Sequence, residues 1–324
     1  MIDTELTRKL GIKYPLIGGA MMSITTPEFV SAISNAGGIG ILASTIYKTP
    51  EEFEAAIDLC FELTNKPFAV NLSLFPAIQA VDNNLYLDIM AEKGVKIVET
   101  SGHSAPVELS KRFKETGMTW IHKCVGPRYA RKVEGLGADL VTVVGYENGG
   151  ATGNFDIGTM VLIPVVRDAV DIPVIGGGGV SDGRGVSAAL CLGACGVIMG
   201  TRLLATKECP IHDNIKQVLL STTEIDTRLV MRSINATHRV LANPAAERCL
   251  ELEAEGADFN QILEVVSGLK AKSMYDGGDI KEGIIACGQG IGLTHDIPSV
   301  TELFDRIMAQ AAQTLTGLNS TLIN

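Results

Sequence analysis

The sequence predicts an α/β fold, a closed (β/α)8 TIM barrel that carries a smaller, mostly helical insertion. Short apolar runs alternate with longer amphipathic runs, and eight short runs can be counted. Several of the helical runs end in glycine, as in "SNAGGIGIL" and "EGLGADLV", where a left-handed residue closes a helix at little cost. A doubly wound open sheet is the competing architecture. The count of eight, and the lack of a complete G-x-G-x-x-G after the first apolar run, favour the barrel.

The eight apolar runs are the expected barrel strands. They occupy residues 15–20, 38–43, 67–73, 95–101, 119–124, 139–145, 172–178 and 196–201. The helices expected between them include "TPEFVSAISNAG", "PEEFEAAIDLCFELT", "APVELSKRFKETG", "RYARKVEGLG" and "GRGVSAALCLG". Strands connected in this way are parallel, so their carboxyl ends all lie on one face of the barrel.

The alternation stops after Thr201. Residues 210–285 contain helical patterns without clear strands, which predicts a helical insertion that covers the barrel. The barrel itself is then expected to comprise 1–209 and 286–324. In the last segment, Ser299 and Glu302 have the spacing of a capping box, so a helix that returns to the barrel wall is expected there.

Composition excludes several classes of protein. The 324 residues are 46% hydrophobic and 20% charged, with a net charge of −10 and no basic run that could neutralise nucleic-acid phosphates. No apolar run reaches the roughly 18 residues of a membrane span, and the polar amino terminus lacks a signal-peptide core, so a cytoplasmic protein is expected. Seven cysteines without a C-x-x-C pair predict buried free thiols and no metal site. The oligomeric state stays open.

Glycines gather where the seventh and eighth strands end. "GGGGVSDGRG" begins at Gly176 and leads into a helix, and "MGTR" supplies Gly200 and Thr201. Backbone amides in such loops, together with a helix amino terminus, favour an anion, and these loops form the common phosphate site of TIM barrels. The alternative is that the glycines only form tight turns.

Lys123 is a cation at the end of the fifth strand. A buried ammonium without a partner is costly, so Lys123 is expected to face a negative or electron-rich group such as a reduced flavin, with a structural ion pair as the alternative. His122 points to the opposite face by strand alternation and is expected to be structural. His103, in a polar loop, is a weaker candidate for a base.

The chain resembles a known family in several motifs. "YPLIGGAMM", "NAGGIGIL", "FAVNLS", "IHKC", "GGGGVSDGRGVSAALCLGACGVIMGTRLLAT" and "ECPIH" are similar to the nitronate monooxygenase (2-nitropropane dioxygenase) family, and "IHKC", "TRLLATKECPIH" and "LVMRS" most resemble its NAD(P)H:quinone reductase branch. The resemblance implies an FMN-binding barrel with a helical insertion over the flavin. The FMN contacts that it implies are Ala20, Met21, Met22, Ser73, Lys123, Gly150, Gly178, Gly179, Gly200, Thr201 and Gln289.

The chain departs from this family in "GYENGGATG". A histidine that accepts a proton from neutral nitroalkanes is expected after the two glycines, where this chain has Ala151. Glu147 is a possible substitute, or else a structural acceptor. Because a positioned base contributes about 10²–10⁴-fold, we expect O2-dependent oxidation of alkyl nitronates but not of neutral nitroalkanes, and a histidine restored at 151 to add the second reaction.

Three alternatives remain open at the level of sequence. An NAD(P)H:quinone reductase needs no protein base for hydride transfer to the flavin. A flavin-dependent enoyl-acyl-carrier-protein reductase would also be expected to carry the missing histidine. A flavin-binding protein without catalysis is the third, although the retained Lys123 and the glycine motif argue against it.

Overall fold

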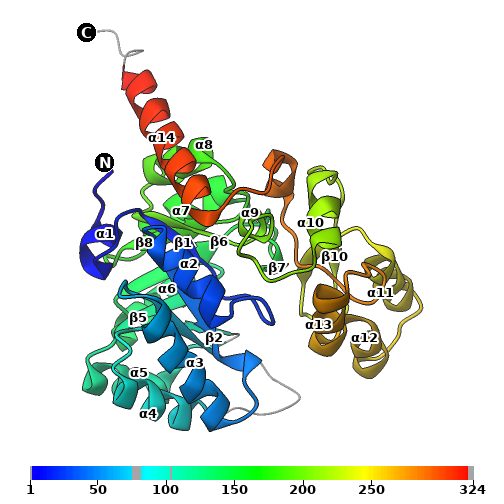
Figure 1. Ribbon diagram of the computed structural model, residues 1–324, viewed down its shortest axis with the longest axis horizontal. Coiled ribbons are helices and arrows are strands. Elements are labelled where there is room, and N and C mark those ends of the chain that lie inside the picture. The colour runs from blue at the N-terminus through cyan, green and yellow to red at the C-terminus, as the bar shows by residue number, and fades with distance from the viewer. Residues whose placement is uncertain (1, 75–81, 103, 320–324) are drawn as a thin grey trace.

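The computed structural model describes residues 2–74, 82–102 and 104–319. Eight parallel strands close into a barrel in the order β1-β2-β3-β4-β5-β6-β8-β9, as the sequence predicts (Figure 1). They are β1 (Leu16–Gly18), β2 (Ile39–Ala43), β3 (Ala69–Ser73), β4 (Ile97–Ser101), β5 (Thr119–Cys124), β6 (Leu140–Val144), β8 (Val174–Gly177) and β9 (Gly196–Met199). Each lies inside the range expected for it.

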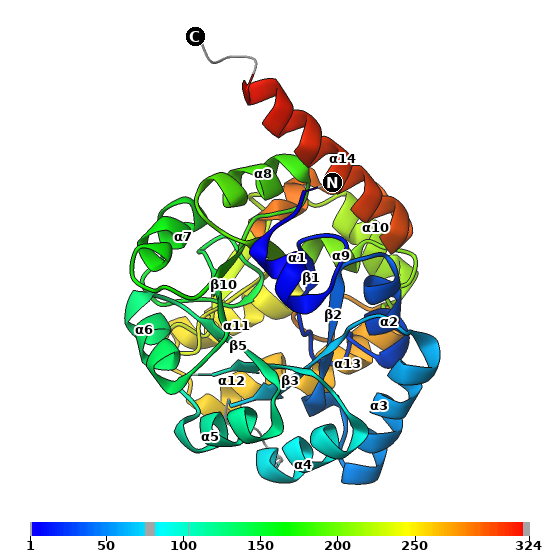
Figure 2. The ribbon, with the colours of Figure 1, turned by 90° about the vertical axis from the view of Figure 1, so that its left-hand side faces the viewer.

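Aliphatic side chains fill the barrel. One core cluster contains Ile17, Ile39, Ile121 and Ile175 from the strands, and it also contains Leu6 of α1 (Glu5–Leu10). Figure 2 shows α1 lying across the amino-terminal end of the barrel. The barrel is therefore packed and closed at that end, and only the carboxyl ends of the strands can form a site.

Helices surround the strands. They are α2 (Pro27–Asn35), the 3₁₀ helix η1 (Ser44–Ile46), α3 (Pro50–Leu63), α4 (Asn83–Lys93), α5 (Val107–Thr116), α6 (Pro127–Leu136), α7 (Thr159–Arg167), α8 (Gly183–Cys191) and α9 (Thr201–Leu204). Three of them end at glycines in the left-handed region: Gly94 with φ 80°, Gly117 with φ 68° and Gly137 with φ 97°. This confirms the glycine endings read from the sequence.

A cap stands beside the carboxyl face of the barrel (Figure 1). It consists of α10 (Asp213–Leu220), β10 (Thr227–Val230), β11 (His238–Leu241), α11 (Pro244–Ala254), α12 (Phe259–Val266) and α13 (Gly268–Gly277). Helices predominate, but the expectation that no strands occur here is wrong. β10 and β11 form an antiparallel sheet with β7 (Gly150–Ala151), which belongs to the loop after β6. β10 and β11 have only four residues each, too few to show a clear alternation in the sequence, and the partner of β11 in the loop after β6 is distant in the chain.

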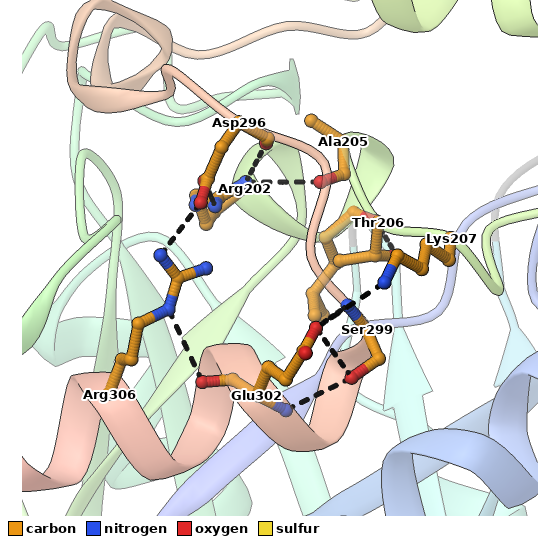
Figure 3. Close-up of polar contacts among 9 residues, drawn as sticks. Arg202, Ala205, Thr206, Lys207, Asp296, Ser299, Glu302 and Arg306 are labelled. Carbon is orange, nitrogen blue, oxygen red and sulfur yellow. Dashed lines mark hydrogen bonds and ion pairs between the residues drawn. The ribbon is translucent and has the colours of Figure 1, made fainter.

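The chain returns through η2 (Gln289–Leu293) to the long helix α14 (Val300–Asn319). The predicted capping box is present: the Ser299 amide donates to the Glu302 carboxylate at 2.8 Å, and the Glu302 amide donates to the Ser299 hydroxyl at 3.2 Å (Figure 3). Asp296 joins this region to the end of β9 by accepting from buried Arg202 at 2.6 Å and from Arg306 at 2.7 Å. α14 packs on α8, where a methyl group at Gly183 would lie 2.4 Å from the Ile307 carbonyl oxygen. No helix in the described ranges has the length and apolar character needed to cross a membrane.

Removal of the Ser299 hydroxyl is expected to weaken the start of α14. The Ser299→Ala substitution leaves the Glu302 amide without its side-chain acceptor and should lower the free energy of unfolding by about 0.5–2 kcal/mol. Urea denaturation measures the change. Gln313→Ala, at an exposed position of the same helix, is the matched control and should change stability by less than about 0.5 kcal/mol. Equal effects of the two substitutions would contradict the role of the capping box.

Candidate active site

A cleft of about 670 Å³, including its opening to solvent, lies at the carboxyl ends of the barrel strands. Its lining comes from β1, β5, β6, β8 and β9 and from the segment that joins the cap to α14. The lining residues are Gly19, Ala20, Met21, Lys123, Val144, Asn148, Gly149, Gly178, Gly179, Val180, Ser181, Ile198, Met199, Gly200, Thr201, Ala286, Gly288 and Gly290.

Glycines allow the backbone to form one wall of this cleft. Gly178 and Gly179 follow β8 with φ of 101° and 72°, values that other residues rarely adopt. A methyl group at Gly178 would lie 2.6 Å from the Thr159 hydroxyl oxygen, and one at Gly290 would lie 2.8 Å from the Gly179 carbonyl oxygen. Main chain thus packs against main chain here and leaves space for a ligand that side chains would otherwise fill.

The amino terminus of α8, which follows these glycines, offers fewer free amides to an anion than the sequence suggested. The Asp182 carboxylate caps α8 by accepting from the amides of Arg184 at 2.9 Å and Gly185 at 3.2 Å, and the Gly183 amide donates to Gln310 at 2.8 Å. The expectation that the amino terminus of α8 receives an anion is therefore wrong, because the protein's own side chains already accept from its amides. The glycine loops after β8 and β9 remain in the cleft without that helix.

Lys123 lines the cleft from the end of β5 and is half-buried. It pairs in register with Ser101 of β4 and Thr142 of β6, so all three face the barrel interior. No carboxylate among the described residues lies within 4 Å of its ammonium group. The structural ion pair considered as an alternative is therefore not formed in the described part of the chain.

Beneath Lys123 the barrel contains a buried carboxyl group. Glu99 is fully buried and accepts from the Asn71 amide at 2.7 Å, while Asn71 also donates to the Ser101 hydroxyl at 3.2 Å. Burial raises the pKa of Glu99, and the Lys123 charge and the Asn71 hydrogen bond only partly oppose this rise. Within the described ranges, Glu99 Oε1 and Thr142 Oγ1 are buried without a hydrogen-bond partner. Such atoms are expected where a polar ligand completes the site.

The neighbouring His122 points out of the barrel interior, as strand alternation predicted. Its Nδ1 lies 2.8 Å from the Thr100 hydroxyl, which also accepts from the Trp120 indole at 2.7 Å. Burial lowers the pKa of His122 to about 4. The ring is therefore a neutral part of the packing between strands and helices.

The carboxylate of Glu147, in the loop after β6, has a structural role. Glu147 accepts from the Thr159 amide at 2.9 Å and from the Thr159 hydroxyl at 2.7 Å, and these bonds hold the first residue of α7. The geometry favours the reading of Glu147 as a structural acceptor over that of a base. Ala151 lies in β7 and is exposed.

Seven of the residues singled out in the sequence come together in the cleft lining: Ala20, Met21, Lys123, Gly178, Gly179, Gly200 and Thr201. Four others are outside the lining formed by the described residues, namely Met22, Ser73, Gly150 and Gln289. Gly150 is in β7, and Gln289 lies between the lining residues Gly288 and Gly290. A methyl group at Gly268 of the cap would lie 2.6 Å from the end of the Met22 side chain, so Met22 faces the cap. His103 lies outside the described residues.

Some site residues were not assigned a role from the sequence. Glu99 and Asn71 carried a signal, because both are polar residues in runs that otherwise read as buried strand. Ser181 donates to the Gly290 carbonyl at 2.8 Å and joins two walls of the cleft, a contact without a local signature. Six of the seven cysteines are buried as expected, and Cys191 is exposed. No cluster of metal-binding side chains occurs in the part of the chain that the structure describes.

Comparison with known proteins places this architecture in a family. The family model described as nitronate monooxygenase matches residues 3–310. The chain belongs to the nitronate monooxygenase family. A probable nitronate monooxygenase of Bacillus subtilis is 30% identical over 94% of this chain and 97% of its own. The (3aS,4S,5R,7aS)-5-hydroxy-7a-methyl-1-oxo-octahydro-1H-indene-4-carboxyl-CoA dehydrogenase of Rhodococcus jostii is 33% identical over 98% of both chains. FabK from Thermotoga maritima superposes with a TM-score of 0.92 at 32% identity, over 99% of this chain and 100% of that one.

Membership of the nitronate monooxygenase family makes the protein an enzyme, a flavin-dependent oxidoreductase. The cleft fits such a cofactor. Glycine backbone forms one wall, and the Lys123 ammonium, which has no carboxylate within 4 Å among the described residues, lines the cleft.

The buried carboxyl group of Glu99 should make the stability of the fold depend on pH. Its pKa is raised, so the native state binds this proton more tightly than the unfolded chain does, and the stabilisation is complete below the unfolded pKa of 4.5 and lost as pH rises through the folded value. Glu99→Gln should therefore gain stability relative to the wild type as pH rises above 4.5. Urea denaturation at several pH values measures this gain. Glu115→Gln, at an exposed position, is the control. A gain that does not vary with pH would contradict the argument.

Proposed function

We propose that the protein is an FMN-dependent oxidoreductase that acts on an organic substrate bound beside the flavin in the cleft. The observation that carries the proposal is the half-buried Lys123 ammonium, which lines the cleft and has no carboxylate within 4 Å among the described residues. A desolvated cation of this kind is stabilised by an anionic or electron-rich ligand. When bound, the flavin supplies two-electron redox chemistry, and a nearby cation favours its reduced form.

The phosphate of FMN would be held by backbone and not by a cluster of cations. Gly178 and Gly179 follow β8, and Gly200 and Thr201 follow β9. Ala20 and Met21, after β1, would contact the flavin ring together with Lys123. Closure of the barrel supports this arrangement, since Met21 Sδ is only 3.7 Å from the position of a methyl group at Gly200.

An acyl-CoA thioester is the first candidate substrate. It is favoured by the relative from Rhodococcus jostii, named as a carboxyl-CoA dehydrogenase, which matches 98% of this chain at 33% identity. The alternative of an enoyl-acyl-carrier-protein reductase belongs to the same thioester class. In either case the protein must bind the thioester beside the flavin and handle a proton next to the thioester carbonyl.

An alkyl nitronate with O2 as oxidant is the second candidate. It is favoured by the matching family model and by the relative from Bacillus subtilis, named as a probable nitronate monooxygenase. A nitronate is already an anion, so it suits a loop in which Ala151 offers no base and Glu147 is engaged by Thr159.

Lys123 can be tested through cofactor affinity. Lys123→Met keeps an unbranched side chain one atom shorter but removes the charge, and should weaken FMN binding by about 10–100-fold, the effect of losing a hydrogen bond to a charged group. Fluorescence titration of the apoprotein with FMN measures this. Lys132→Met, on the exposed side of α6, is the control. A wild-type protein that does not bind FMN would reject the proposed function.

The substrate class can be separated by anaerobic mixing of the FMN-loaded protein. An acyl-CoA thioester, an alkyl nitronate and NAD(P)H are each added, and loss of the visible flavin absorbance is followed, with free FMN as control. Reduction by the thioester supports the first candidate, and reduction by the nitronate with O2 uptake on aeration supports the second. Reduction only by NAD(P)H, with reoxidation by a quinone, would favour the NAD(P)H:quinone reductase. If none of the three compounds reduces the flavin, the result would favour a flavin-binding protein without catalysis.

A further inference from the structure

The inward side chains of the barrel strands form layers, and Lys123 belongs to one of them. In a closed barrel of tilted strands, each layer takes one residue from every second strand. The strand registers give one layer from β3, β5, β8 and the end of β1, which consists of Gly19, Asn71, Lys123 and Gly177. The next layer toward the amino-terminal end comes from β2, β4, β6 and β9 and consists of Ile41, Glu99, Thr142 and Ile198. Glu99 therefore lies in the layer immediately beneath that of Lys123.

Glu99 has little in its layer to support a negative charge. Among the described residues it is the only acidic one that is buried. Its Oε2 accepts from the Asn71 amide at 2.7 Å, whereas its Oε1 has no hydrogen-bond partner among the described residues. The rest of the layer is a hydroxyl and two aliphatic side chains, those of Thr142, Ile41 and Ile198. An ionised carboxylate away from water needs several donors or a cation in contact, so this environment favours the neutral acid.

Within the described ranges, Lys123 is the ionisable side chain that faces Glu99 inside the barrel. The inward residues beside Glu99 on β3, β5 and β6 are Asn71, Ile121, Lys123 and Thr142, and only Lys123 carries a charge. Burial raises the pKa of Glu99, and the Lys123 charge and the Asn71 hydrogen bond oppose this rise in part. His122 is on the other face of β5 and is neutral, because burial lowers its pKa to about 4. The charge at this level of the barrel therefore depends on Lys123 and on the proton of Glu99.

We propose that Glu99 is a positioning residue that acts through Lys123: it keeps its proton, and so leaves the full positive charge of Lys123 to an anionic ligand in the cleft. The inference rests on the proposed function, in which that ligand is FMN. An ionised Glu99 would pair electrostatically with Lys123 across the two layers and would weaken the attraction of the cleft for an anion. The proton on Glu99 thus decides whether these two residues together carry one positive charge or none.

The affinity for FMN should follow the Glu99 proton in one direction. Below the folded pKa of Glu99 the carboxyl group is neutral, and the affinity is complete. As pH rises through that value the carboxylate forms, and the affinity should fall by about tenfold or more. Glu99→Gln keeps an acceptor for Asn71 but cannot ionise, so it should match the wild type at neutral pH and lack this fall.

The first test detects the proton directly and needs no cofactor. Infrared spectra of the apoprotein at neutral pH should contain the carbonyl stretch of a neutral carboxylic acid, and Glu99→Gln should remove it. Glu115→Gln, the same change at an exposed position of α5, should remove no such band. Labelling of the wild type with carboxyl-¹³C glutamate should shift the band, which assigns it to a glutamate even if Glu99→Gln does not fold. Lys123→Met removes the opposing charge, so its band should persist to at least the pH at which the wild type loses it.

The second test compares FMN affinity with the infrared band over a series of pH values. Fluorescence titration should give equal affinities for wild type and Glu99→Gln wherever the wild-type band is present, and weaker binding by the wild type wherever it is lost. A band and a ratio of affinities that both stay constant agree with a proton that is never released.

Three results would overturn the inference. They are absence of the acid band at neutral pH, FMN binding by Glu99→Gln that is about tenfold or more tighter than that of the wild type at neutral pH, and a ratio of affinities that does not follow the band. Failure of the wild type to bind FMN would instead overturn the proposed function, while the spectra of the apoprotein would still report the proton on Glu99.

Discussion

The pairing of the first barrel strand with the last is the constraint on which the site depends. β1 and β9 are parallel with Ile17 opposite Ile198, and the Gly19 amide donates to the Met199 carbonyl at 3.0 Å. In an open sheet these two strands would be the opposite edges. Closure instead places the residues after β1 against Gly200, and so assembles one cleft from segments almost two hundred residues apart.

Buried polar groups in the barrel near this cleft lower the stability of the folded protein. Glu99 is fully buried, and its Oε1 and Thr142 Oγ1 have no hydrogen-bond partner among the described residues. Unsatisfied groups of this kind destabilise a folded chain unless a ligand completes them. A cofactor that binds only the native state would offset this cost and stabilise the fold by mass action.

The cap is coupled to the barrel through backbone as well as through side chains. The loop after β6 contributes β7 to the sheet of the cap, and Arg239 of the cap packs on Tyr146 of that loop. The sheet of the cap therefore includes a strand from the barrel loop, and the register between β7 and β11 fixes how that loop meets the cap.

The sequence by itself determined the barrel, because each strand and helix has its own local periodicity and its own glycine ending. It also indicated Lys123 and the glycines after β8 and β9, since parallel strands place all their carboxyl ends on one face. It could not determine the pairing of β11 with β7 or the hydrogen bonds from Thr159 to Glu147. These contacts depend on which distant segments meet, and contacts between distant segments leave no periodic signal in the chain.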